Sequence, residues 1–147
     1  MSDATAPAPV SVATVASTEL IKNLLLGAQA TTAAITAIGA QYDLTVDEWL
    51  ILDGLDSSDG ATMSEVSVST LASGASLTRA VDRLVTRSLV YRTPSATDRR
   101  KVEVRISDLG RDLHAQMRRQ VSELETSLRS ALDVAGTDQL TAALGEL

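Results

Sequence analysis

The sequence of 147 residues contains no cysteine, no phenylalanine and a single histidine. Without cysteine it can form neither a disulfide nor a thiolate metal site, and it has no thiol for redox sensing or nucleophilic catalysis. One histidine cannot make a histidine-rich metal site, so we expect no metal and no other cofactor. The sequence also lacks an apolar run that could cross a bilayer, and its start lacks the basic and leucine-rich segments of a secretory signal. We therefore expect a cytoplasmic protein that does not enter the membrane.

The patterns of the common catalytic centres are missing as well. There is no cluster of histidine with carboxylates, no Gly-rich phosphate loop and no Gly-x-Ser-x-Gly elbow. An enzyme is therefore the least favoured class of protein. The chain does have a globular balance, with 44% hydrophobic and 22% charged residues over the length of one typical domain. A single domain with its own core is expected.

Charge is distributed unevenly along the chain. The formal net charge is -6, which on average disfavours a nucleic-acid partner. Residues 75–119, however, contain eleven Arg or Lys and five Asp or Glu, so this segment carries +6 and the remainder -12. An arginine-rich module within an acidic protein is typical of nucleic-acid binding, because binding depends on the local field. A solvated charged surface is the alternative, and charge alone does not separate the two.

Local patterns predict a mainly α chain with one small β-hairpin. Residues 1–16 contain two prolines and no periodicity, and we expect them to form a disordered arm. Hydrophobic spacings of three and four indicate helices, and two short β-like runs flank a basic tip. The expected helices cover residues 17–39, 45–56, 63–70, 73–87, 107–132 and 138–146, and the expected strands cover 89–93 and 102–106.

Capping patterns support several of these helix starts. Thr45 and Thr62 are each followed three residues later by glutamate, which is the form of a capping box. Ser17, Ser73 and Ser107 are expected to cap the first, fourth and fifth helices through their hydroxyl groups. The short helix after Thr62 is rich in Val and Thr, so tertiary packing must support it.

A short helix, a tight turn, a second helix and a hairpin follow one another in the order of a winged helix-turn-helix. Helix pairs and hairpins also occur in proteins that bind no DNA, so the residues must decide. The second helix of such a motif lies in the major groove, and Arg79 is placed nearly opposite the apolar stripe of this helix. Arginine can donate two hydrogen bonds to guanine. The residues expected at this DNA surface are Ser73, Ala75, Ser76, Arg79, Arg83, Thr86 and Arg87, with Thr86 and Arg87 nearer the phosphates.

The segment from Thr78 to Arg92, followed by Asp98-Arg99-Arg100 and by Ile106-Ser107-Asp108-Leu109-Gly110, resembles the MarR (multiple antibiotic resistance regulator) family. The resemblance implies that Arg99, in the wing, enters the minor groove of DNA. It implies that Asp98 holds the wing through an ion pair or turn hydrogen bonds, and that Arg100 contacts phosphate or braces Asp98. Ser88 stands where the family usually has glycine in a left-handed conformation, at a cost of about 1 kcal/mol.

The resemblance also implies how the chain is organised. The expected fold is a winged helix-turn-helix with N- and C-terminal dimerisation helices, because two copies are needed to reach successive major grooves. The expected function is a sequence-specific double-stranded DNA-binding transcriptional regulator, a ligand-responsive repressor that binds a pseudo-palindromic operator as a homodimer. A helical dimeric adaptor that binds no DNA is the alternative, and it leaves the basic segment unexplained. A single domain is expected over 17–147, with dimerisation helices at 17–40 and 108–147 and the DNA-binding lobe at 45–107.

Regulators of the resembled family often bind small aromatic or other lipophilic anions between the dimerisation helices and the DNA-binding lobe. A corresponding effector site is implied here, and with few aromatic residues it would be flexible, aliphatic or even open to solvent. For Trp49 and His114 a structural role is the alternative, because a single Trp usually lies in a core and a single His is usually satisfied within the protein. The side chains that could line the site are Tyr42, Trp49, Arg111, His114 and Met117.

Overall fold

The computed structural model describes residues 18–131 and 134–146. The arm expected over residues 1–16 and the cap expected at Ser17 lie outside the described residues. The described chain is mainly helical with a small antiparallel sheet, as the sequence predicts. Its elements are α1 (Glu19–Gly39), the 3-10 helix η1 (Ala40–Tyr42), α2 (Val46–Asp56), β1 (Ala61–Thr62), α3 (Met63–Val68), α4 (Gly74–Thr86), β2 (Val90–Pro94), β3 (Val102–Ile106), α5 (Asp108–Ala131) and α6 (Val134–Gly145).

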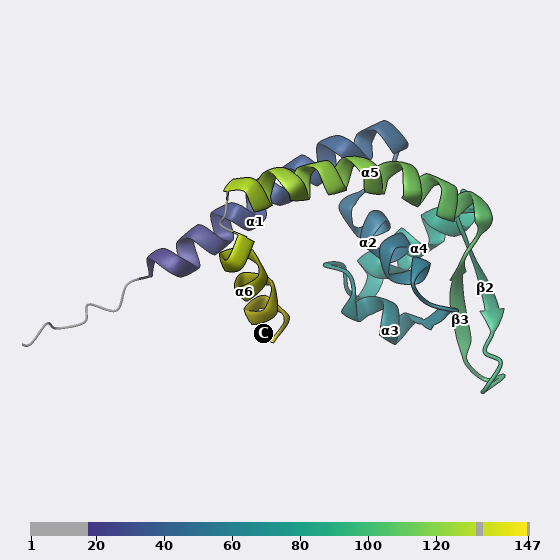
Figure 1. Cartoon of the computed structure of the whole chain (residues 1–147). Coiled ribbons are helices and arrows are strands. Elements are labelled where there is room, and N and C mark those ends of the chain that lie inside the picture. The colour runs from purple at the N-terminus through teal and green to yellow at the C-terminus, as the bar shows by residue number, and fades with distance from the viewer. Residues whose placement is uncertain (1–17, 132–133, 147) are drawn as a thin grey trace, which may run out of the picture.

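The elements form a lobe attached to a pair of long helices. Figure 1 shows α1 and α5 running alongside each other, with α6 folding back from the end of α5. The helices α2, α3 and α4 make up the lobe, and the β2–β3 hairpin projects from it. Because α2 contacts α1, α4 and α5, it is the element that joins the lobe to the long helices.

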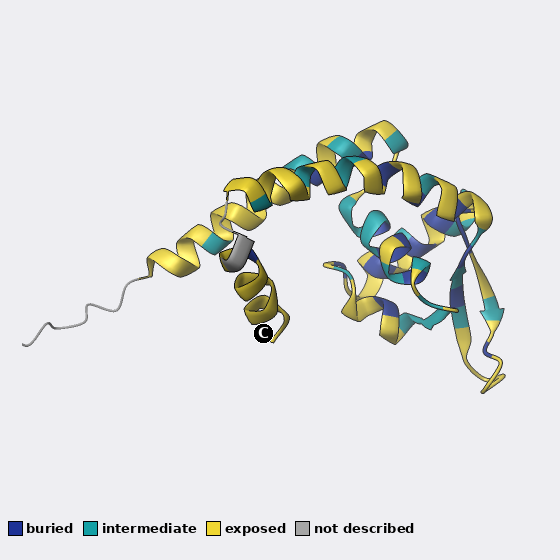
Figure 2. Cartoon of the chain, viewed as in Figure 1, coloured by how far each residue is buried: buried dark blue, intermediate teal, exposed yellow. Residues whose placement is uncertain are grey.

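The core lies inside the lobe and beneath α5. Ile51 and Leu52 of α2, Val81 and Leu84 of α4, and Val104 of β3 are all completely buried. Figure 2 shows this buried interior together with the contrasting exposure of the N-terminal half of α1 and of α6. The exposed large hydrophobic side chains on these two helices are Leu20, Ile21, Leu25, Leu26, Leu140 and Leu144.

The sheet has the strand order β1-β3-β2, and both pairings are antiparallel. In the hairpin, Val90 pairs with Ile106 and Pro94 pairs with Val102. The sequence placed the first of these strands one residue too early and did not predict β1. A strand of two residues shows no alternation of polar and apolar side chains, so the sequence carries no signal for it.

The predicted capping boxes are confirmed. The Glu48 amide donates to the Thr45 hydroxyl at 3.2 Å and the Glu65 amide to the Thr62 hydroxyl at 3.3 Å. Ser107 caps α5 by accepting the Gly110 amide at 3.0 Å. At the start of α4 the roles differ from the prediction, because the Ser73 amide donates to the Ser76 hydroxyl at 3.2 Å.

Of two further helix ends, one differs from the prediction and one agrees with it. The last helix begins at Val134 and not at Asp138, so Gly136, expected to precede it, lies within the helix. An interior glycine costs a helix only about 1 kcal/mol, so it does not have to interrupt one. After α4, Ser88 has a φ of 58°, which confirms the left-handed backbone expected there.

The left-handed Ser88 is part of a Schellman motif. The Ser88 amide donates to the Val85 carbonyl at 2.9 Å, and the Leu89 amide donates to the Leu84 carbonyl at 2.9 Å. The start of α5 packs directly on this turn, where a Cβ on Gly110 would lie 2.1 Å from the Leu89 carbonyl oxygen. Glycine is therefore required at position 110 for α5 to begin beside the hairpin.

Candidate nucleic-acid interface

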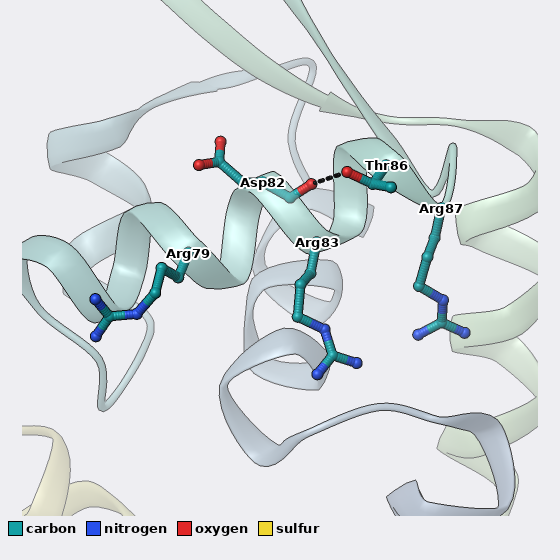
Figure 3. A pocket seen from close by; sticks show the side chains of 5 residues that line it. All are labelled: Arg79, Asp82, Arg83, Thr86 and Arg87. Carbon is teal, nitrogen blue, oxygen red and sulfur yellow. Dashed lines mark hydrogen bonds between the residues drawn. The ribbon is translucent and has the colours of Figure 1, made fainter.

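The outer face of α4 carries the side chains that the sequence assigns to DNA contact. The helix buries Leu77, Val81 and Leu84 on its inner face. The Arg79 side chain has no hydrogen bond or ion pair within the described residues, and in Figure 3 it points away from Arg83 and Arg87. The exposed residues of this helix and its cap include Ser73, Ala75, Ser76, Arg79, Arg83 and Thr86, and Arg87 is half-buried.

A shallow hollow of about 460 Å³ lies on this face and is lined by Arg79, Asp82, Arg83, Thr86 and Arg87. The Thr86 hydroxyl donates to the Asp82 carbonyl at 2.9 Å (Figure 3). The Asp82 carboxylate accepts from Arg92 of β2 at 2.7 Å and so ties α4 to the hairpin. The lining carries more positive than negative charge, which suits an anionic backbone.

A buried carboxylate holds Arg83. Glu48 of α2 is 1% exposed, and its Oε1 lies 3.0 Å from Arg83 Nε. Its second oxygen accepts the Thr45 amide at 2.9 Å. A buried carboxylate is tolerated when donors satisfy it, and here both oxygens have one. Arg83 is therefore fixed through Nε, while its terminal nitrogens face the surface beside Asp43.

Arg87 makes more contacts within the chain than Arg83 does. Its guanidinium donates to the Tyr42 carbonyl at 3.0 Å and to the Asp43 carbonyl, and the Asp43 carboxylate lies 3.7 Å away. These contacts join the end of α4 to the connection between α1 and α2. The sequence assigned Arg87 to the vicinity of the phosphates, and that role stays a prediction. In the described chain the guanidinium holds the C-terminal end of α4 against residues 42–43.

The wing tip is organised by two side chains. Ser95 is 3% exposed, and its hydroxyl accepts the Thr97 amide at 3.3 Å. The Asp98 carboxylate accepts the Arg100 amide at 3.0 Å, which is one of the turn hydrogen bonds expected of Asp98. Arg99 and Arg100 are exposed, and their side chains have no partner among the described residues. The tip therefore presents adjacent free guanidinium groups on a hydrogen-bonded turn.

The side chains considered for an effector site all lie where α2, η1 and α5 meet. Gln120 donates to the Tyr42 hydroxyl at 2.6 Å, and Arg111 donates to Asp56 at 3.2 Å. His114 is 1% exposed and lies 2.9 Å from Asp53 and 3.6 Å from Asp56, so it has a structural role in holding α5 on α2. Met117 belongs to the core. These residues line neither the hollow on α4 nor a second one of about 300 Å³ between α2, β1 and α3.

Trp49 differs from its neighbours in this region. Its ring packs against the core, but the indole N–H is buried and has no acceptor within the part of the chain that the structure describes. Buried donors are nearly always paired, so this group calls for an acceptor from elsewhere.

Within the described ranges no helix has the length and hydrophobicity to cross a membrane, and no cluster of three His, Cys, Asp or Glu could hold a metal.

The sequence did not reveal the acidic residues that position the arginines. Glu48 was recognised as part of a capping box, but its contact with Arg83 was not. Asp43 and Asp82 were not singled out at all. Their contacts reach residues between 10 and 44 positions away in the chain, and no local pattern marks such pairs.

Comparison with known proteins gives consistent matches. Residues 42–101 match the model of the MarR family. The Uncharacterized HTH-type transcriptional regulator YhbI of Bacillus subtilis (strain 168) is 28% identical over 106 residues, which are 72% of this chain and 69% of that protein. Among solved structures, the transcriptional repressor CouR bound to a 23-mer DNA duplex has 26% identity and a TM-score of 0.74, over 88% of this chain and 92% of CouR.

Two further structures share the fold. BpsR of Bordetella bronchiseptica, whose DNA binding is regulated by 6-hydroxynicotinic acid, has 24% identity and a TM-score of 0.75, over 88% of this chain and 93% of BpsR. Wild-type MarR from E. coli in the apo form has 23% identity and a TM-score of 0.71, over 86% of this chain and 95% of MarR. The matched segment 42–101 contains the helix-turn-helix and the first wing strand, and the structural matches extend the likeness to the long helices. The described chain has the winged helix-turn-helix fold, and its residues 42–101 match the MarR family.

Proposed function

We propose that this protein is a sequence-specific double-stranded DNA-binding transcriptional regulator and acts as a repressor in the cytoplasm. The observation that carries the proposal is the exposed guanidinium of Arg79 on the outer face of α4, which has no partner among the described residues and lines the hollow together with Arg83 and Arg87. A free guanidinium on a recognition helix can donate two hydrogen bonds to guanine in the major groove. The likeness to CouR, a repressor with a DNA duplex bound, supports the same mode of action.

The proposed roles follow from how each side chain is held. Arg79 reads a base, and the small residues Ala75 and Ser76 near the cap Ser73 let the helix approach the bases closely. Thr86 and Arg87 are proposed to contact phosphates. Arg83, which the sequence predicts beside Arg79 at the base edges, is assigned to a phosphate as well, because Glu48 holds its Nε. In the wing, Asp98 holds the turn, Arg99 enters the minor groove and Arg100 contacts phosphate.

Binding to duplex DNA at several salt concentrations tests the proposal, followed by selection of bound sites from random duplexes. We expect affinity to fall steeply as salt rises, because phosphate binding releases counterions. We also expect the selected sites to have two-fold symmetry. Salt-independent binding without a selected sequence would instead favour the helical dimeric adaptor.

We propose that the regulator is a homodimer built from α1, α5 and α6. The apolar side chains Leu20, Leu25 and Leu26 of α1 and Leu140 and Leu144 of α6 are between 37% and 67% exposed in the single chain. Helices that expose such faces gain free energy when a second copy covers them. A dimer also places two recognition helices on one operator, which accounts for the affinity that one small lobe lacks.

We propose that a small aromatic or lipophilic anion regulates DNA binding from a site near Tyr42, Trp49, Arg111, His114 and Met117. The buried indole N–H of Trp49, which has no acceptor in the part of the chain that the structure describes, supports this, because an anion would supply one. Trp49 is the only tryptophan, so its fluorescence reports on the site. Titration with 6-hydroxynicotinic acid and with benzoate should change the emission saturably and weaken DNA binding over the same concentration range. An emission change that leaves DNA binding intact would contradict a regulatory site.

A further inference from the structure

We propose that Asp43 is an intramolecular competitor for DNA phosphate, which limits the affinity of α4 for duplexes of any sequence. The inference rests on the proposed function, since it concerns the strength of that DNA contact. It assigns a role to a residue outside the recognition helix and the wing. The role is carried by the charge of Asp43 and not by any contact of Asp43 with DNA.

Asp43 faces the two arginines at the C-terminal end of α4. Its Oδ1 lies 3.8 Å from Arg83 Nη2, and its Oδ2 lies 3.7 Å from Arg87 Nη1. The Asp43 side chain is 80% exposed, so the carboxylate stands at the surface. Figure 3 shows the guanidinium groups of Arg83 and Arg87 pointing to one side and that of Arg79 pointing elsewhere. One surface carboxylate therefore lies beside two of the arginines around the hollow, while Arg79 has no ion pair within the described ranges.

The backbone holds Asp43 in this position. Its φ of 52° and ψ of 43° are left-handed, a conformation that Asp and Asn adopt more readily than most residues. The Asp43 carbonyl accepts from Arg87, and the next residue, Leu44, is buried and donates its amide to the Gly39 carbonyl at 3.0 Å. The carboxylate is thus attached to a fixed turn and cannot move far from the arginines.

Glu48 and Asp43 act differently on Arg83. Glu48 is buried and binds Nε, so it orients the guanidinium and leaves the terminal nitrogens available. Asp43 lies 3.8 Å from Nη2, a terminal nitrogen that a phosphate would also bind. A phosphate that binds there must displace the carboxylate or lie beside a like charge, and either event costs free energy. The net positive charge available to phosphate is therefore smaller than the arginine count indicates.

Asp43→Asn tests the inference, because asparagine tolerates the left-handed backbone, keeps the size and removes the charge. We expect both the selected site and an unrelated duplex to bind roughly two- to fivefold more tightly at low salt. The plot of log affinity against log salt should become steeper by up to about one unit, because the terminal nitrogens of Arg83 and Arg87 no longer face a competing carboxylate.

Asp138→Asn is the matched control. Asp138 is also an exposed carboxylate paired with an arginine, Arg129, but both belong to the end of α5 and to α6. Equal gains in the two variants would show a general effect of net charge and would overturn the inference. In an Arg83→Gln, Arg87→Gln background the gain from Asp43→Asn should disappear, and a gain that persists would also overturn it.

The remaining outcomes are separable. If Asp43→Asn lowers the melting temperature, Asp43→Gly removes the carboxylate while accepting the left-handed backbone, and it must give the same tighter binding. Unchanged affinity in both variants would refute the inference while leaving the proposed function in place. A wild-type protein that binds no duplex at any salt concentration would refute the proposed function itself.

Discussion

The arginines of the recognition helix differ in what already binds them. Arg79 has no partner among the described residues, Arg83 is held by the buried Glu48, and Arg87 donates to two backbone carbonyls. Reorienting Arg83 or Arg87 toward a base would break hydrogen bonds to buried or backbone groups, which carries a free-energy cost. A contact between Arg79 and a base carries no such cost, so recognition of the DNA sequence should depend mainly on Arg79.

Arg79→Ala should therefore remove sequence preference. We expect a loss of about 1–3 kcal/mol on the selected site, since a bidentate contact to guanine discriminates by that amount, and a smaller loss on a scrambled duplex. Titration of both duplexes at one fixed salt concentration measures the difference. Equal weakening of the two duplexes would identify Arg79 as a phosphate contact.

Ser88 offers a test of backbone strain. Its φ of 58° is accessible to glycine without penalty, so Ser88→Gly should raise the free energy of unfolding by up to about 1 kcal/mol. Urea denaturation measures this change. Ser127→Gly, in the exposed interior of α5, is the control and should lower stability by a similar amount, since glycine is unfavourable within a helix. A loss of stability in Ser88→Gly would show that the side chain contributes something other than strain.

The stability of the helix-turn-helix should depend on pH through Glu65, in the first turn of α3. The Thr62 amide and hydroxyl donate to Glu65 at 2.7 and 2.9 Å, and these hydrogen bonds hold the pKa of Glu65 below its ordinary range. A lowered pKa in the folded state stabilises the fold above the unfolded pKa, and this contribution is lost as pH falls through the folded value.

Glu65→Gln should accordingly flatten the acid side of the stability profile. Between neutral pH and about pH 3, the wild type should lose more stability than the variant, because only the wild type has this carboxylate to protonate. Urea denaturation across that range provides the measurement, with Glu123→Gln on the exposed face of α5 as the control. Parallel profiles for the wild type and Glu65→Gln would show that the capping carboxylate does not contribute.

The wing can be tested as an element by comparing its two arginines. If Arg99 enters the minor groove, Arg99→Ala should weaken sites with A·T-rich flanks more than sites with G·C-rich flanks, since narrow grooves attract the guanidinium most. Arg100→Ala should weaken both kinds of site alike and reduce the salt slope by about one unit. Identical flank dependence in the two variants would make the wing a simple electrostatic tether.

The elements that the sequence predicted are those with local causes. Thr45, Thr62 and Ser107 begin helices through hydrogen bonds that span three residues, so the sequence displays each pattern directly. The spacing of hydrophobic residues likewise predicted the hairpin and the exposed position of Arg79 on α4. The 3-10 turn η1, the short strand β1 and the bond from Arg87 to the Tyr42 carbonyl depend on contacts up to 45 residues apart. Only the folded chain creates those contacts.

At the scale of the whole molecule, the proposed dimer depends on the two ends of the chain. A chain that stops before Leu124 loses the end of α5 and all of α6, which in the proposed dimer would cover the exposed apolar face of α1. We expect this truncated protein to be monomeric and to unfold at a lower temperature, because its exposed leucines lose their partner. Size-exclusion chromatography with light scattering and thermal unfolding measure both properties. A full-length protein that is monomeric at micromolar concentration would contradict the dimer.

The uncovered leucines of α1 and α6 also bear on how a cell could set the response of such a regulator. If only the paired chains hold an operator, the occupied fraction rises with the square of the chain concentration wherever single chains predominate and most operators are empty. Halving the rate of synthesis would then reduce repression about fourfold under those conditions, with no effector involved. The same hydrophobic faces that complete the fold would give the gene circuit a threshold.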